Sequence, residues 1–188
     1  MRIDFATMLE SLGFSSITHS DEDVSKFLHN VKNKEHCVLI FQSEIIRDKI
    51  ISEFFNSEFT NNTTTAIFTH NPSKFNCNKI IEYNELIENQ KLVPNKINEF
   101  LVTVLDESYE KNYPKIVCED TAWFSEIGLF KEHQESKIPE KILNESTIMC
   151  CYNTNKLNVE QLKTVLKTRN FIILEKPFSV YAKNIIQN

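Results

Sequence analysis

Two adjacent carboxylates follow a short apolar run near the middle of the chain. In the stretch KIVCEDTAWFSEIG, residues 115–128, the run ends at Glu119 and Asp120, and the single tryptophan of the chain, Trp123, comes three residues later. An acid at the end of a buried strand holds magnesium in many nucleotide hydrolases. Carboxylates also serve as general acids and bases. The stretch therefore suggests either chemistry, and the rest of the sequence must separate them.

Nucleotide hydrolysis is excluded by the scarcity of glycine. Backbone N–H groups must wrap the phosphates closely, which requires a glycine-rich loop after the first strand of the core. The chain has two glycines, Gly13 and Gly128, and no GxxxxGK[ST] motif. The first expected strand of the core runs directly into QSEIIRDK, residues 42–49.

Acid–base chemistry by the two carboxylates remains open. Adjacent residues of a strand point to opposite faces, so Glu119 and Asp120 form a pair only if the chain bends there. Asp120 is also a suitable N-cap for the following helix. An enzyme would need His70 within hydrogen-bond reach of one of the acids. The five histidines show no HxxxH or HExxH spacing, and we expect no metal site.

Five cysteines are present without CxxC spacing: Cys37, Cys77, Cys118, Cys150 and Cys151. Four of them lie in apolar runs of the kind that form strands, where a free cysteine behaves as a small hydrophobic residue. We therefore interpret them as core residues, with a redox or metal role as the lesser alternative. Reduced cysteines are typical of the cytoplasm.

Composition excludes several classes of partner. The chain of 188 residues has a formal net charge of −5, which argues against a broad nucleic-acid-binding face. No apolar run approaches the roughly 18 residues that a membrane span requires. The N-terminal residues lack the apolar core and cleavage site of a signal peptide, so we expect a cytoplasmic protein. No cofactor is expected.

Apolar runs alternate with amphipathic segments along most of the chain. Strands are expected at 36–42, 63–70, 79–83, 115–120, 146–153, 171–175 and 178–184, and the longer helices at 43–55, 95–110 and after Asn158. This alternation predicts an α/β fold with three layers, a mainly parallel sheet and helices on both faces.

The chain divides into a helical N-terminal extension, residues 1–34, and an α/β domain, residues 35–188. In the extension, residues 4–12 predict a short helix, a loop follows, and Ser20 can cap a second helix.

Ligands of open parallel sheets bind at the carboxyl ends of the strands. Those ends carry polar and aromatic side chains here. The predicted ligand-binding residues are Gln42, His70, Glu119, Asp120, Trp123 and Tyr152.

The segment from VCEDTAWF to FIIL, residues 117–174, resembles the MEDS domain, a sensory domain named from methanogens, methylotrophs and a dichloromethane-dehalogenase regulator. Asp120, Ala122 and Trp123 match a helix start of that family, Glu135 its helical glutamate, and residues 150–153 its Cys-x-Tyr-Asp strand end. The resemblance covers about residues 35–175, and three features depart from the pattern. Asn153 replaces the aspartate, residues 168–171 replace a His-Pro element, and the middle segment, residues 57–95, is short and lacks the usual glycines.

The resemblance implies a RecA-like fold that lacks the phosphate loop, similar to the ATPase core of a circadian-clock protein. It also implies a sensory role in signal transduction, with small hydrocarbon derivatives as the class of signal. We therefore expect a non-catalytic module that binds a small ligand or a partner protein at the strand ends. The alternatives are a scaffold whose N-terminal helices dock a partner or a second copy, and an enzyme that uses Glu119 or Asp120 with His70.

Overall fold

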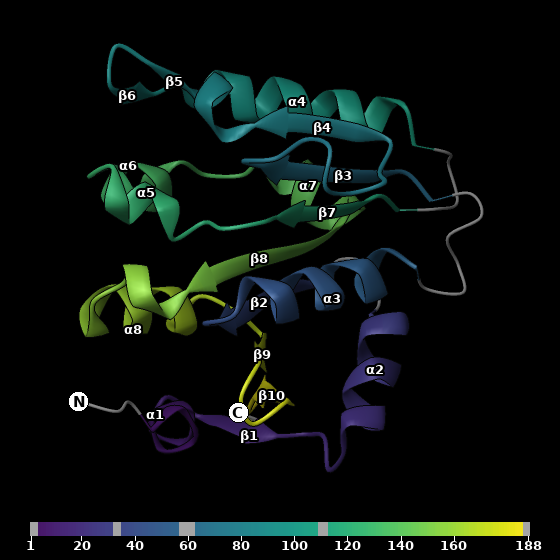
Figure 1. Cartoon of the computed structure of the whole chain (residues 1–188), viewed down its shortest axis with the longest axis vertical. Helices are drawn as coiled ribbons and strands as arrows, with labels where there is room; N and C mark the ends of the chain where they lie inside the picture. Colours follow the sequence, from purple (N-terminus) through teal and green to yellow (C-terminus); the bar gives the residue numbers. More distant parts are fainter. Residues whose placement is uncertain (1–3, 32–34, 57–62, 109–112, 186–188) are drawn as a thin grey trace.

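The computed structural model describes residues 4–31, 35–56, 63–108 and 113–185. Its centre is an eight-stranded sheet in the order β1-β10-β9-β2-β8-β7-β3-β4 (Figure 1). The strands are β1 (Phe14–Ser16), β2 (His36–Phe41), β3 (Thr65–Thr69), β4 (Lys79–Glu82), β7 (Lys115–Cys118), β8 (Thr147–Asn153), β9 (Phe171–Leu174) and β10 (Ser179–Lys183). Neighbouring strands from β9 to β4 are parallel, and β10 and β1 add antiparallel pairs. The predicted α/β class is confirmed.

Helices cover both faces of the sheet, as expected. One face packs against α2 (Asp21–His29) and α3 (Glu44–Phe55). The other face packs against α1 (Phe5–Ser11), α4 (Pro94–Asp106), α5 (Trp123–Glu126), α6 (Phe130–Glu135), α7 (Glu140–Glu145) and α8 (Val159–Lys167). The two-residue period of a strand divides the core: Leu39 of β2 faces α3, whereas Val38 and Ile40 face the other layer.

Local signals set where the helices begin. Ser20 and Ser43 accept hydrogen bonds from the N–H groups of the third helical residues of α2 and α3. Asn158 and Gln161 form a reciprocal capping box at the start of α8. Pro94 occupies the first turn of α4, where its missing N–H costs nothing. Gly128, at φ +76°, separates α5 from α6 as the sequence predicts.

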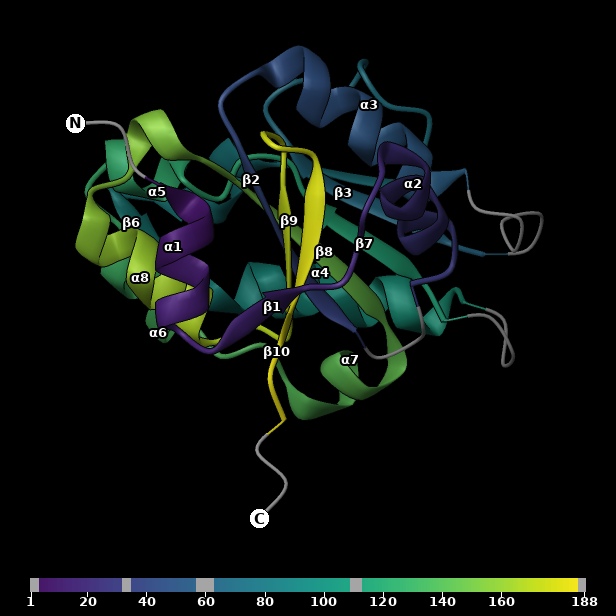
Figure 2. The same ribbon diagram turned by 90° about the horizontal axis from the view of Figure 1, so that it is seen from below.

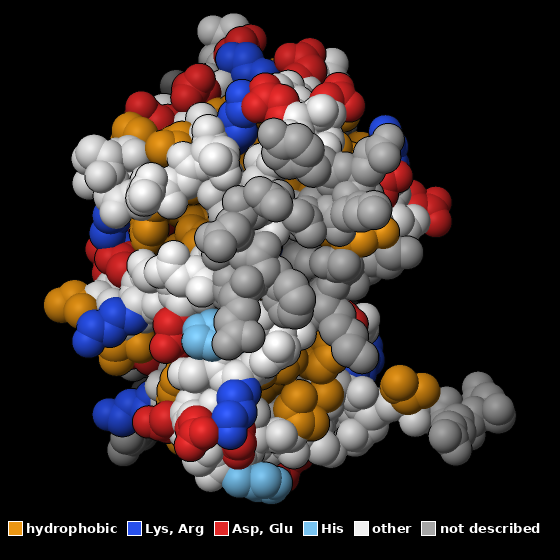
Figure 3. Space-filling model, turned by 90° about the vertical axis from the view of Figure 1, so that its right-hand side faces the viewer, with side chains coloured by type: hydrophobic (Ala, Val, Ile, Leu, Met, Phe, Trp, Pro, Cys, Tyr) orange, Lys and Arg blue, Asp and Glu red, His pale blue; other side chains and the backbone are white. Residues whose placement is uncertain are grey.

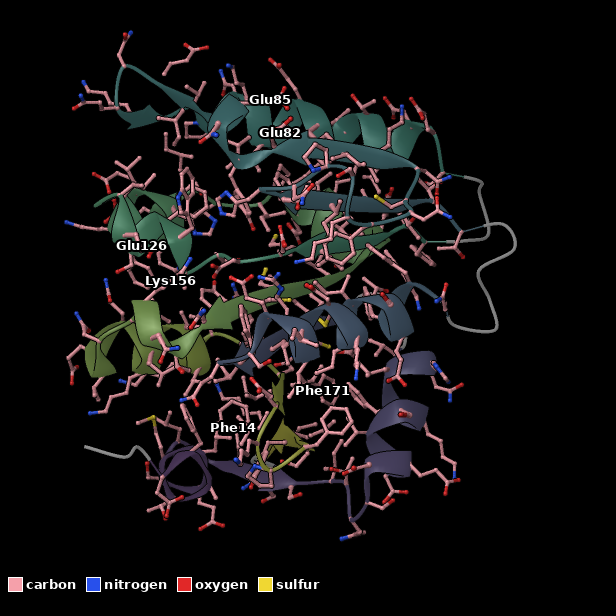
Figure 4. All side chains as sticks on the ribbon, viewed as in Figure 1. Phe14, Glu82, Glu85, Glu126, Lys156 and Phe171 are labelled. Atoms are coloured by element: carbon pink, nitrogen blue, oxygen red, sulfur yellow. The ribbon has the colours of Figure 1, made fainter. Side chains whose placement is uncertain are left out.

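The N-terminal segment contributes more than helices. Where a loop was expected after residue 12, β1 pairs antiparallel with β10 and forms the edge of the sheet. Leu9, Phe14 and Val24 are buried in the core of the same chain. Figure 2 shows α1 and α2 on opposite sides of β1 and β10. Phe171 of β9 packs on Phe27 of α2 with ring centroids 5.2 Å apart, on the face opposite to Phe14 (Figure 4).

Two further elements were not anticipated. A small hairpin, β5 (Ile87–Glu88) with β6 (Lys91–Leu92), turns through Asn89 and Gln90, both at positive φ. Helix α7 follows Pro139. In the part of the chain that the structure describes, no helix is both long and apolar enough to cross a membrane. Figure 3 views the side toward the amino ends of the central strands, where acidic and basic side chains are interspersed.

Candidate functional site

The carboxyl ends of β2, β3, β7, β8 and β9 meet at one edge of the sheet because these strands are parallel. Glu119 follows β7 there and is only 3% exposed. Its carboxylate accepts hydrogen bonds from the Thr69 hydroxyl, from the His70 backbone N–H at 3.0 Å and from Arg47 Nη2 at 2.9 Å. Groups of the protein itself therefore satisfy the carboxylate of Glu119, the acid that the sequence places at the strand end.

Arg47 of α3 is the cation of this cluster. Its guanidinium is 3% exposed, contacts Asp48 at 2.8 Å and lies 5.1 Å from the ring centroid of Phe41. Lys74 approaches Asp48 at 2.6 Å and Glu119 at 3.8 Å. The two cations balance the two acids. Glu119 thus faces Arg47 at the carboxyl end of β7.

Asp120 turns to different partners. Lys156 Nζ lies 2.6 Å from Asp120 Oδ2 and 2.8 Å from Glu126 Oε2, and Figure 4 shows Glu126 and Lys156 pointing toward one another. Burial raises the pKa of Asp120, and the hydrogen bond from Lys156 opposes this. The possible N-cap role of Asp120 is not realised, since α5 follows Ala122 without a side-chain cap.

His70 belongs to an aromatic cluster. Its ring centroid lies 4.6 Å from that of Tyr83 and 5.0 Å from that of Trp123. Burial lowers the pKa of His70. Among the described residues, no hydrogen bond joins the imidazole to Glu119 or Asp120; only the His70 backbone N–H reaches Glu119. The acid–histidine contact that an enzyme would need is thus not formed in this conformation.

The last two predicted residues lie apart from these groups. Gln42 is exposed, and its backbone N–H donates to the Glu175 carboxylate, which also accepts from Ser43 N–H at 3.0 Å. Tyr152 is fully buried under the opposite layer of helices. The six predicted residues therefore share an edge of the sheet but belong to separate environments.

A cavity of about 350 Å³ lies on the α4 face of the sheet. Its floor includes Phe68, Ile116 and Ile148 from three neighbouring strands, and α4 contributes Ile97 and Leu101. Residues of α6, α7 and the segment between them close it. None of the six predicted residues, all of which the structure describes, lines this cavity.

Tyr83 and Phe124 separate the cavity from the strand edge. Both side chains line the cavity and both contact Trp123, with ring centroids 5.6 Å and 5.3 Å away. The Tyr83 hydroxyl also accepts a hydrogen bond from the backbone N–H of Asp120 at 3.1 Å. One aromatic wall is thus shared by the cavity and the predicted site.

A group of polar side chains interrupts the apolar lining. Cys118 of β7 and Cys150 of β8 are direct partners in the parallel register. His36 Nε2 lies 3.3 Å from Cys150 Sγ. His133 and Arg169 also line the cavity. Sulfur, imidazole and guanidinium groups therefore line the cavity together with Asn98, Gln134 and Lys137 and its apolar side chains.

These neighbours act on the thiols in opposite directions. The hydrogen bond from Cys118, together with the adjacent His36, holds the pKa of Cys150 well below its usual range. The same hydrogen bond and burial raise the pKa of Cys118. Burial lowers the pKa of His133 to about 4. The charged form of Cys150 is therefore the favoured one of the pair.

Sequence reasoning treated Cys118 and Cys150 alike as core residues. Cys37 and Cys151 fit that interpretation, since both are fully buried on the α3 face. Cys150 differs because of His36, which lies more than a hundred positions earlier in the chain. No local sequence motif indicates the register in which β2, β7 and β8 pair.

No protein-family model matches this chain, and no curated protein is significantly similar to it. Among the described residues, no group of three or more His, Cys, Asp and Glu side chains is arranged to hold a metal ion.

Proposed function

We propose that the protein is a non-catalytic sensory module that binds a small, largely apolar molecule in the cavity beneath α4, α6 and α7. The observation that carries this proposal is the cavity itself. Its volume of about 350 Å³ lies at the small end of ligand sites, and its walls are apolar with a few convergent polar groups. A sensory role is also what the resemblance to the MEDS domain implies, and that relationship stays a prediction.

The strand edge is the weaker location for a ligand. Glu119 and Arg47 are both nearly inaccessible and satisfy one another. A ligand bound there must separate them, and breaking a buried ion pair costs about 3–5 kcal/mol. A ligand in the cavity breaks no such ion pair. Tyr83 lines the cavity and also contacts His70 at the strand edge, so one side chain separates the ligand from that edge.

The output of the module would be a shift in the helices that close the cavity. Helices α6 and α7 have six residues each, and a segment without regular structure joins them. Short helices of this kind depend on packing for their stability. A ligand that contacts them in only one arrangement shifts the population toward that arrangement.

Binding of 1-butanol to the full chain tests the proposal. We expect amide chemical-shift changes in α4, α6 and β8, and a rise in the midpoint of thermal unfolding. Ile97→Trp fills the cavity and should abolish both effects. The matched control is Val102→Trp on the same helix, because Val102 is 45% exposed and should leave binding unchanged.

Two results would overturn the proposal. One is an equal response of the two tryptophan variants. The other is a set of shift changes confined to Gln42 and the Arg47 cluster, which would move the ligand site to the strand edge.

A further inference from the structure

The cavity holds a thiol that ordinary core packing does not explain. Cys150 is 4% exposed and lines the space directly. An imidazole nitrogen lies 3.3 Å from its sulfur, and Cys118 stands beside it in the register. A cysteine that served only as a hydrophobic residue would need neither neighbour.

The surroundings of Cys150 place a proton acceptor and a positive charge near its sulfur. His36 on β2 can accept the thiol proton and remain as the adjacent cation. Cys118 on β7 donates to the sulfur, and the Arg169 guanidinium adds positive charge from the segment before β9. In the part of the chain that the structure describes, Arg169 has no ion pair with a carboxylate, and its Nη1 donates to the carbonyl and the hydroxyl of Thr168.

The comparison with Cys77 shows how specific this environment is. Cys77 is half-buried on the other side of the sheet, and its thiol donates to the backbone carbonyl of Lys79. Burial raises the pKa of Cys77 to about 11. The same residue type therefore has its pKa raised at one position and lowered at the other.

We propose that Cys150 captures small aliphatic aldehydes as reversible thiohemiacetals, with His36 as the proton carrier. This inference rests on the proposed function, since it names the ligand class of the same cavity. The sulfur attacks the carbonyl carbon and forms the C–S bond. The electron pair of the C=O π bond moves to oxygen, which takes the proton that the thiol gave to His36. Nothing leaves, and the sum is thiol plus aldehyde giving thiohemiacetal.

The position of His36 is what selects a carbonyl compound. The nitrogen that holds the proton lies beside the sulfur, and the new oxygen is attached to the carbon bonded to that sulfur. The proton therefore has a short path to the oxygen. The apolar walls suit an alkyl chain, and an addition without a leaving group can reverse, as a sensor requires.

The test uses the full chain with butanal labelled with ¹³C at the carbonyl carbon. We expect a ¹³C resonance of an sp³ carbon bonded to oxygen and sulfur, and a native mass increased by one intact butanal. Both should disappear on dialysis. Cys77→Ser should retain the adduct. Cys150→Ser and Cys150→Ala should lose it, and His36→Gln should slow the formation and the reversal of the adduct by about a hundredfold.

1-Butanol separates this inference from the proposed function. If the Cys150 variants still bind 1-butanol, their cavity is folded, and loss of the butanal adduct then identifies the thiol. An adduct that persists in both Cys150 variants, or a mass gain that lacks one water as in lysine imines, would overturn the inference while the cavity proposal stands. Failure of the wild-type chain to bind either molecule would overturn the proposed function itself.

Discussion

The acids around Arg47 at the strand edge differ in burial, so substitutions of Glu119 and of Asp48 should differ in their effect on stability. Glu119→Gln leaves Arg47 buried without its full counter-charge, so we expect the free energy of unfolding to fall by about 3 kcal/mol. Asp48→Asn removes another partner of the same guanidinium. The Asp48 side chain is 24% exposed, so this change should cost less than about 1 kcal/mol. Urea titrations of both variants measure the difference, and equal losses would contradict this account of the cluster.

His133 links stability to pH. Its ring stacks on Phe124 at a centroid distance of 4.2 Å, and burial places its pKa at about 4 in the folded chain, below the ordinary 6.5. Between these values the unfolded chain binds the proton more readily, so acidification favours unfolding. The contribution of His133 is complete above pH 6.5 and is lost as the pH falls toward 4.

Urea midpoints measured from pH 7 to pH 4 check this expectation. His133→Leu should show a shallower decline than the wild-type chain over this interval. The groups whose charges act on His133 are Cys150 and Arg169, so the same series in Cys150→Ser separates their effect. Parallel curves for wild type and His133→Leu would show that other groups cause the acid sensitivity.

Residue types alone predicted part of the site. The sequence indicated that Glu119 and Asp120 would pair only if the chain bends there, and in the structure they turn to Arg47 and Lys156 respectively. It did not reveal either cation, because each comes from another part of the chain. Cys150 shows the same limit, since its environment depends on the alignment of β2, β7 and β8.

At the scale of elements, β1 closes one edge of the sheet with only three residues. Phe14 is the buried residue of β1, with 1% of its surface exposed. Ile17, just beyond the strand, is 46% exposed. We expect Phe14→Ala to lower the free energy of unfolding by about 3 kcal/mol, and Ile17→Ala to change it little. Denaturant titration distinguishes the two. A small effect of Phe14→Ala would mean that the edge strand adds little to the core.

Periodicity predicted the long elements well and the short ones poorly. Residues 37–41 of β2 and 147–153 of β8 are buried on both faces, so their continuous apolar character identifies these strands. Strand β1 has one buried residue in three, and the β5–β6 hairpin lacks an Asn-Gly turn. Tertiary pairing decides both, and no local pattern records it.

At the scale of the molecule, the sheet separates two kinds of polar chemistry. The α3 side and the strand edge hold carboxylates that are paired with cations, as at Glu119. The α4 side holds thiols and imidazoles around an unfilled space. The rule that places ligands at strand ends directed the prediction to the strand edge, where a ligand stays a prediction. The cavity arises from how α4, α6 and α7 pack, which the sequence does not state.

The shared aromatic wall gives the molecule a built-in optical reporter. Trp123 is the single tryptophan, and its ring stands one side chain away from the cavity through Tyr83 and Phe124. Its other neighbour, His70, is an imidazole whose protonated form quenches indole emission. Filling the cavity should therefore change Trp123 fluorescence without any label, and His70→Leu should remove the part of the signal that varies with pH. The same residue that first drew attention beside the two acids would thus make occupancy visible in real time.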